Sequence, residues 1–301
     1  MPLRRLPAWA LFLNGLVFVH TNGRVAFQRT EGDTTFVLFD KGREPCVSPD
    51  GKRVVYWTSA PASPRAANAT GATGTTAAID TSAPLVWADV DGGARGQLRA
   101  GNLRSPHFSP DGKQLIWGEM VDGRWAVMRG NRDGSAATLL FRGPESVFHA
   151  SWLPDGSGIL THDLDNLYWV ALDGRVRRQT AVRDVVGAAS ISSDDRFLVS
   201  PADGNRLLFS AAVDATKAMD RAVHYDGGSS ALFLYDLAGG RRTRLTGEDV
   251  FAHDPAWSRD GKSISCRGFR IGKRPLRDGI LRVPVDGGEI TRVAPGSEPS
   301  Q

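Results

Sequence analysis

One short motif recurs at intervals along the chain. It has the sequence Ser-Pro-Asp-Gly, or a close variant of it, at residues 48–51, 109–112, 153–156, 192–195 and 258–261. Each copy follows a short segment with Pro or Ala and an aromatic or branched residue, and precedes a run of β-forming residues. Asp-Gly between two such runs is a hairpin signal, because glycine accepts the positive φ of a tight turn. The motif therefore predicts repeated β-hairpins.

A second turn signal follows each copy of the motif, at residues 91–93, 133–134, 173–174, 239–240 and 286–288. Two hairpins per repeat make four strands, and repeats of about 40 residues with four short strands are typical of a β-propeller. Its blades bury their faces against their neighbours. We therefore predict an all-β fold, a six-bladed β-propeller of four-stranded antiparallel blades. It forms a single domain over residues 1–301, with blades at about 1–42, 43–102, 103–145, 146–184, 185–249 and 250–297.

The apolar N-terminal segment has two interpretations. Arg4 and Arg5 precede apolar residues 6–19, as in a secretory signal, but no Ala-x-Ala cleavage site follows. Pro7-Ala-Trp9 instead resembles Pro255-Ala-Trp257, the segment predicted as the first strand of the sixth blade. We therefore expect the first blade to begin here and the protein to be cytoplasmic. The alternative is a periplasmic or secreted protein in which residues 1–19 act as a signal.

The repeated Pro-x-aromatic-Ser-Pro-Asp-Gly-Lys pattern resembles the repeat of TolB-type six-bladed propellers over nearly the whole chain. The resemblance implies the fold and says little about function. The sequence has no counterpart of the amino-terminal domain that TolB carries, so TolB's role in envelope maintenance is not transferred. The similar propeller of prolyl oligopeptidases accompanies a hydrolase domain, and no Gly-x-Ser-x-Gly elbow is present here.

Charged residues enter the first strand of several repeats. Strand direction alternates, so these entries and the loops between second and third strands lie on one face of the ring. We expect the channel mouth on that face to carry Arg43, Glu44, Arg104, His149, His253 and Asp254. Such a ring can bind an acidic group or a peptide terminus by charge-assisted hydrogen bonds. The alternative is that these charges hydrate the channel or pair with one another.

Two insertions, at residues 59–84 and 204–230, fall between second and third strands of opposite blades. They are predicted to bracket the same mouth, with a short helix near residues 211–219. The sixth repeat also carries a basic stretch predicted to lie in a loop on this face. Its residues are Arg267, Arg270, Lys273, Arg274 and Arg277.

The charge balance favours some partners over others. There are 37 basic and 33 acidic residues, a net charge of +4, and aromatic residues seldom interrupt the basic stretch. A solvated loop or an acidic protein partner is therefore favoured over nucleic acid for this stretch, while a peripheral membrane contact stays open. No segment reaches the roughly eighteen apolar residues of a transmembrane helix.

No metal or cofactor site is predicted. Oligogalacturonate lyases are similar propellers with a histidine-lined metal site, but here only His149 and His253 share the mouth. Cys46 and Cys266 are predicted to be buried small apolar residues, and the tryptophans to fill the spaces between blades. We expect a non-catalytic protein-interaction platform, an accessory or scaffold subunit of a larger assembly. The alternative is an enzyme, a lyase or hydrolase, that acts on an acidic saccharide or small molecule at the mouth.

Overall fold

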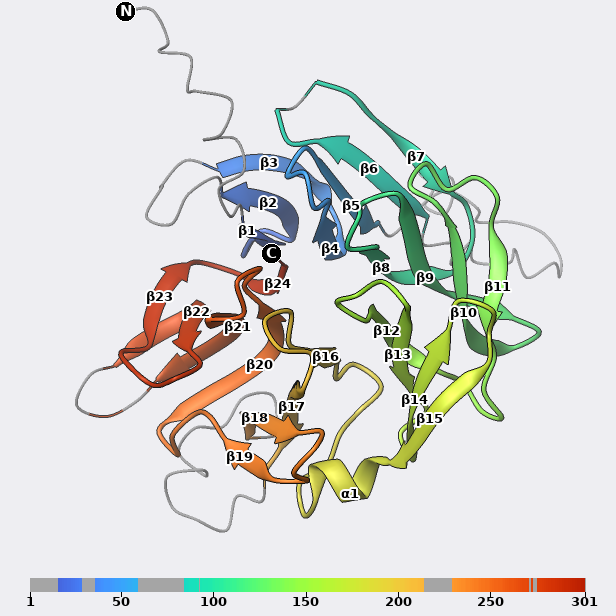
Figure 1. Cartoon of the computed structure of the whole chain (residues 1–301). Helices are drawn as coiled ribbons and strands as arrows, with labels where there is room; N and C mark the ends of the chain where they lie inside the picture. Colours follow the sequence, from blue (N-terminus) through green and yellow to red (C-terminus); the bar gives the residue numbers. More distant parts are fainter. Residues whose placement is uncertain are drawn as a thin grey trace, which may run out of the picture.

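The computed structural model describes residues 16–28, 36–58, 84–91, 93–213, 229–270, 272 and 275–300. Six antiparallel sheets of four strands surround a central channel (Figure 1). The predicted all-β, six-bladed propeller is therefore confirmed. The insertion at 59–83, most of the second insertion and Pro7-Ala-Trp9 lie outside the described residues, as do Lys273 and Arg274.

Every blade is a meander whose strands follow one another from the channel outward. Blade 1 contains β24 (Ser297–Ser300), β1 (Leu16–Val19), β2 (Arg24–Gln28) and β3 (Phe36–Lys41). Blade 2 contains β4 (Arg43–Val47), β5 (Arg53–Trp57), β6 (Leu85–Asp89) and β7 (Arg95–Arg99). Blade 3 contains β8 (Leu103–Phe108), β9 (Gln114–Val121), β10 (Arg124–Asn131) and β11 (Thr138–Phe141).

The second half of the ring repeats this arrangement. Blade 4 contains β12 (Phe148–Trp152), β13 (Gly158–His162), β14 (Asn166–Ala171) and β15 (Val176–Ala181). After the short helix α1 (Val182–Val186), blade 5 contains β16 (Phe197–Val199), β17 (Arg206–Ala212), β18 (Ser230–Asp236) and β19 (Arg242–Arg244). Blade 6 contains β20 (Val250–Trp257), β21 (Ser263–Arg270), β22 (Leu276–Pro284) and β23 (Thr291–Ala294).

The Ser-Pro-Asp-Gly motif forms the turn between the first two strands of a blade. In blade 3 the Ser109 hydroxyl donates to Asp111 Oδ1 at 2.6 Å and accepts from the Gln114 amide at 2.9 Å. The Lys113 amide also donates to Asp111, at 3.1 Å. Gly112 takes the positive φ of +70° that the turn requires. The Ser109 and Asp111 side chains thus find their hydrogen-bond partners close by in sequence.

The core lies between the blades. In the described part of the chain, a separate apolar cluster fills each interface between neighbouring blades, the junction of blades 1 and 6 included. Tryptophans contribute as predicted: Trp117 is buried, and the Trp152 and Trp257 indoles each donate to a backbone carbonyl of the preceding blade. Cys46 and Cys266 are also buried, as predicted.

The C-terminal segment closes the ring. β24 pairs with β1 and takes the innermost place of blade 1, so the C-terminus lies near the centre of Figure 1. The sequence predicted Pro7-Ala-Trp9 for this strand, so the strand comes from the other end of the chain. Leu16–Val19, the end of the apolar N-terminal segment, form the fully buried strand β1. Among the described residues, no helix has the length and apolar character needed to cross a membrane.

Blade 5 departs from the predicted register. The Ser-Ser-Asp-Asp sequence at 192–195 is not its first turn, and Phe197–Val199 form its first strand, not its second. The turn is instead the Ser-Pro-Ala-Asp-Gly sequence at 200–204, where Asp203 accepts from the Asn205 and Arg206 amides. This turn has one residue more than Ser-Pro-Asp-Gly, which hid it. Ala211 and Ala212, predicted to begin a short helix, belong to strand β17, and residues 214–219 of that predicted helix lie outside the described residues.

Candidate functional site

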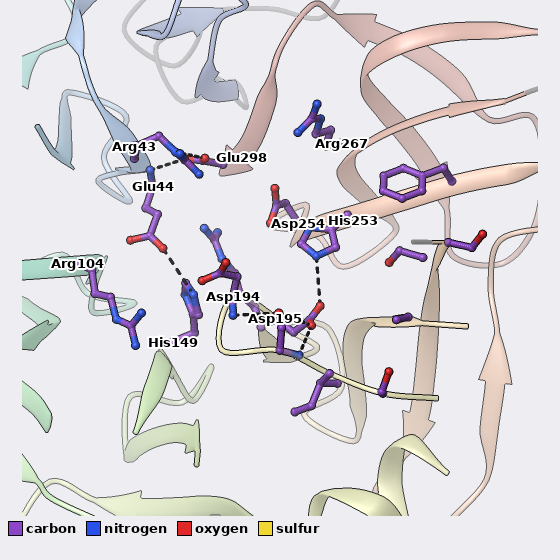
Figure 2. Close-up of a pocket in the computed structure, with 18 of the residues that line it drawn as sticks. Arg43, Glu44, Arg104, His149, Asp194, Asp195, His253, Asp254, Arg267 and Glu298 are labelled. Carbon is purple, nitrogen blue, oxygen red and sulfur yellow. Dashed lines mark hydrogen bonds and ion pairs between the residues drawn. The ribbon is translucent and has the colours of Figure 1, made fainter. Parts of the chain in front are cut away.

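A cavity of about 720 Å³ lies at the channel end where the first strand of each blade begins. Trp57, Ala212 and Ser229, at the described ends of the two insertions, also line it, so the insertions leave from its rim. All six blades contribute to the lining. Its charged residues and histidines are Arg43, Glu44, Arg104, His149, Asp194, Asp195, Arg196, His253, Asp254, Arg267 and Glu298, of which Figure 2 labels all but Arg196.

The six residues predicted for the mouth all line this one cavity. Of the three described residues of the basic stretch, Arg267 lines the cavity and Arg270 and Arg277 do not. Arg267 and Arg270 lie on strand β21 and Arg277 on β22, so the predicted loop position is wrong for these three. The hairpin of blade 6 simply extends further than the sequence indicated. Arg267 also forms an ion pair with Asp278 at 3.5 Å, which offsets part of the positive charge.

The first strands share a bulge at the mouth. Five residues at equivalent places, none of them glycine, have φ between +41° and +53°: Glu44, Ser105, His149, Asp254 and Glu298. The ladder register shifts at this place in blades 1, 2, 3, 4 and 6. A bulge redirects a side chain, and left-handed backbone in a residue other than glycine costs on the order of 1 kcal/mol or more. The bulge directs these side chains towards the channel and towards one another.

Glu44 connects blade 2 to its neighbour. Its Oε2 atom accepts from the Ser105 amide at 2.6 Å, the Ser105 hydroxyl at 3.1 Å and the Trp57 indole at 2.8 Å. His149 continues the network into blade 4, because its Nδ1 lies 2.9 Å from the Ser105 hydroxyl. Burial, helped by the positive charges of Arg196 and Arg104, holds the pKa of His149 well below its usual range. His149 is therefore neutral at physiological pH.

Glu298 connects the closing strand to blade 2. Its carboxylate accepts hydrogen bonds from the Arg43 guanidinium and, at 2.6 Å, from the Glu44 amide. The side chain is nearly buried, and burial raises the pKa of Glu298. The Glu298 carboxylate thus joins the closing strand β24 to blade 2.

His253 connects blade 6 to blade 5. Its Nδ1 lies 2.9 Å from Asp254 Oδ1, and its Nε2 lies 3.4 Å from Asp195 Oδ1. Burial alone would lower the pKa of His253, but the two carboxylates outweigh burial and raise it to about 10. The same contact overcomes the effect of burial on Asp254 and lowers the pKa of that carboxyl to about 2. His253 is consequently a permanent cation at neutral pH.

Two arginines have a different environment from these groups. The Arg104 guanidinium lies over the rings of Trp125, at 4.1 Å from the centroid, and Phe148, at 4.9 Å. Its Nη2 atom is buried and has no hydrogen-bond partner among the described residues. Arg196 is only 6% exposed, and its Nε atom is likewise without a partner in the described chain.

Four of the cavity's charged residues, Asp194, Asp195, Arg196 and Glu298, were missed by the sequence prediction. The register error in blade 5 hid the true start of its first strand, although aligning the five-residue turn at 200–204 brings Asp195 and Arg196 to the mouth. Glu298 had a signal too, because Glu298-Pro299 repeats Glu44-Pro45 and Asp254-Pro255.

The arrangement combines a ligand-sized cavity with fixed charges of both signs. Neither His149 nor His253 titrates near neutral pH, and a general acid or base works best when its pKa lies near the operating pH. In the parts of the chain that the structure describes, no three His, Cys, Asp or Glu side chains are grouped as metal ligands. The geometry is therefore better suited to binding polar groups than to proton transfer.

The comparisons with known proteins agree on the fold alone. No protein-family model and no curated protein matches the chain. Solved structures do match, among them TolB from Acinetobacter baumannii, with 15% sequence identity and a TM-score of 0.62 over 96% of this chain and 67% of that chain.

Two other solved structures that match the chain are named as a protease domain and as a lyase. The β-propeller domain of the trilobed protease from Pyrococcus furiosus has 14% identity and a TM-score of 0.52, covering 91% of this chain and 75% of that chain. Oligogalacturonate lyase from Vibrio parahaemolyticus has 14% identity and a TM-score of 0.50, covering 89% of this chain and 76% of that chain. One fold thus accompanies several functions. The chain has the fold of a TolB-type six-bladed β-propeller.

Proposed function

We propose that the chain is a non-catalytic recognition subunit whose channel mouth receives a segment of a partner protein. The observation that carries this proposal is the cavity of about 720 Å³ to which all six blades contribute charged or polar side chains. Its size falls within the range of about 300–1,000 Å³ that is usual for ligand sites. An exposed segment of a protein can enter such a mouth and form charge-assisted hydrogen bonds with its walls.

The rigidity of the mouth supports recognition. Glu44, Ser105 and His149 hold blades 2, 3 and 4 in one hydrogen-bond network, while His253 and Asp195 tie blade 6 to blade 5. A site whose side chains are already fixed loses little conformational entropy when a ligand binds.

In the enzymatic alternative, a lyase or hydrolase for an acidic saccharide, Ser105 beside His149 would be the candidate nucleophile. Ser105 is only 3% exposed, and its hydroxyl also bonds to Glu44. A nucleophile must reach its substrate, whereas this hydroxyl lies inside a network that joins three blades. The contact therefore favours a structural part for Ser105. Turnover of an acidic oligosaccharide by the purified protein, lost in Ser105→Ala, would favour the enzyme instead.

Site-specific photocross-linking in the native host tests the proposal. A benzophenone amino acid at Asp194, exposed at the cavity, is expected to capture one protein partner on irradiation. The matched control places it at Ala94, exposed in the β6–β7 turn on the opposite face of the ring. Capture at Asp194 alone supports the proposal. Equal capture at both positions, or no adduct at Asp194, contradicts it.

A further inference from the structure

The acids and the arginines of the cavity differ in how far their hydrogen-bonding capacity is used. Counting His253 as a cation, five cationic and five acidic side chains line the cavity, so its formal charge is balanced. Four of the five acids nevertheless have hydrogen-bond or ion-pair partners within the protein. These acids are Glu44, Asp195, Asp254 and Glu298.

Arg196, unlike these four acids, has no hydrogen-bond or ion-pair partner among the described residues. Its charge acts on Asp254 and Glu298 nearby. Both of those carboxylates already have closer partners. A buried guanidinium without a hydrogen-bonded partner is costly, so its presence in a cavity lining favours an external partner.

Arg104 provides a second unmet donor on the same side of the cavity. Its aromatic neighbours Trp125 and Phe148 contact the guanidinium through their ring faces and accept no conventional hydrogen bond. No ion pair within 4.0 Å engages it among the described residues. Both arginines line the same cavity and their charges help to lower the pKa of His149, and Figure 2 shows Arg104 extending towards His149.

We infer that Arg196 and Arg104 form a subsite for a carboxylate group of the bound segment, either its C-terminal carboxylate or an Asp or Glu side chain. The inference rests on the proposed function and names the group that the mouth recognises. A guanidinium binds a planar carboxylate through two parallel hydrogen bonds. A single negative charge suits two unpaired guanidiniums, whereas the repulsion from five nearby carboxylates disfavours a phosphate dianion.

The first test follows the arginine Nε–H signals by NMR while small probes are added to the full chain. N-acetylglycine mimics a C-terminal carboxylate, N-acetylaspartic acid methylamide mimics a side-chain carboxylate, and N-acetylglycinamide is the uncharged control. The Arg196 and Arg104 signals, assigned by substitution, are expected to shift in a saturable manner with at least one of the acids and to stay unchanged with the amide. The acid that binds more tightly identifies the source of the carboxylate.

The substitutions Arg196→Met and Arg104→Met are each expected to weaken binding of the preferred acid by about tenfold or more, the loss of one charge-assisted interaction. Arg177→Gln, at an exposed position of the outer strand β15, removes the same charge and should leave the dissociation constant within about twofold. Equal binding of the amide, equal binding of inorganic phosphate, or equal weakening by Arg177→Gln would overturn the inference.

A second readout separates ligand binding from a structural part. Because Arg196 lacks a partner, Arg196→Met is expected to leave Tm unchanged or raise it without a probe, and to abolish the rise in Tm that the acid causes in the parent protein. A lower Tm that Arg196→Lys restores would show a structural partner and overturn the inference.

Carboxylate binding without a cross-linked protein would leave the subsite standing and contradict the proposed protein partner. A cross-linked partner without carboxylate binding would support the proposed protein partner and overturn the carboxylate subsite.

Discussion

The first strand of each blade has two ends with contrasting chemistry. At the turn end, Asp111 takes its hydrogen bonds from residues two positions away in sequence. At the mouth end, Ser105 and His149 are 44 residues apart, and Arg43 and Glu298 are 255 residues apart. The side chains of the blade 3 turn therefore have their partners within one hairpin, whereas the mouth requires the assembled ring.

The contrast shows which polar residues hold the propeller together. A turn that is satisfied locally can form in an isolated hairpin and contributes little to contacts between blades. Four of the five strained residues of the mouth, in contrast, have partners on neighbouring blades, so these bonds form only when the ring closes. These four residues are Glu44, Ser105, His149 and Glu298. Acidic residues of the two ends should consequently differ in their effects when they are replaced.

The largest effect is expected for Glu44→Leu. The substitution leaves the Ser105 amide, the Ser105 hydroxyl and the Trp57 indole without their acceptor in a buried site. We expect a loss of about 3 kcal/mol in the free energy of unfolding, measured by urea denaturation. Glu44→Gln keeps an acceptor and should lose less. If Glu44→Leu costs no more than a substitution in an exposed turn, the contrast between the two ends fails.

His253→Gln should have a large effect that depends on pH. The pKa of His253 is raised from the ordinary 6.5 to about 10 in the folded protein, so its stabilisation is complete below about pH 6.5 and disappears as pH rises through 10. We expect a loss of about 3 kcal/mol at pH 6 and a much smaller loss at pH 10.5, measured as the difference in unfolding free energy from the parent. Parallel pH profiles of parent and variant would contradict this assignment.

Asp111→Ala should have the smallest effect. The Asp111 side chain is largely exposed, and its removal takes an acceptor from the Ser109 hydroxyl and the Lys113 amide and an ion-pair partner from the Lys113 ammonium. Ser109 is buried, but its hydroxyl keeps the hydrogen bond from the Gln114 amide. The expected loss is about 1 kcal/mol in the same urea measurement. A loss as large as that of Glu44→Leu would show that the turns also carry contacts between blades.

The same contrast explains which parts of the structure could be predicted from sequence. Local turn chemistry revealed five of the six blades, because Asp and Gly are required at fixed offsets within each hairpin. One extra residue in the turn at 200–204 was enough to shift the register of blade 5 and to conceal Arg196. The innermost strand of blade 1 was missed because its partner is far away in sequence, so no local spacing signals the pairing.

The candidate site was also predicted only in part: its position and six of its residues were predicted, but their interactions were not. The six residues found by aligning strand entries do share a cavity, because each blade places that position at the channel. Their protonation and their partners were not predictable. Whether His149 is neutral and His253 charged depends on side chains from other blades, and these meet only in the closed ring.

Ring closure by β24 also has a consequence for synthesis of the chain. Between β1 and its partner strand lie about 280 residues, which take roughly 15 to 60 s to translate at about 5–20 residues per second. During that time the inner edge of β1 has unpaired backbone groups, which can pair with other chains. A nascent chain interrupted before residue 297 would have neither this edge covered nor the Glu298 carboxylate in place. The arrival of β24 therefore completes the charged mouth and covers this strand edge in the same step.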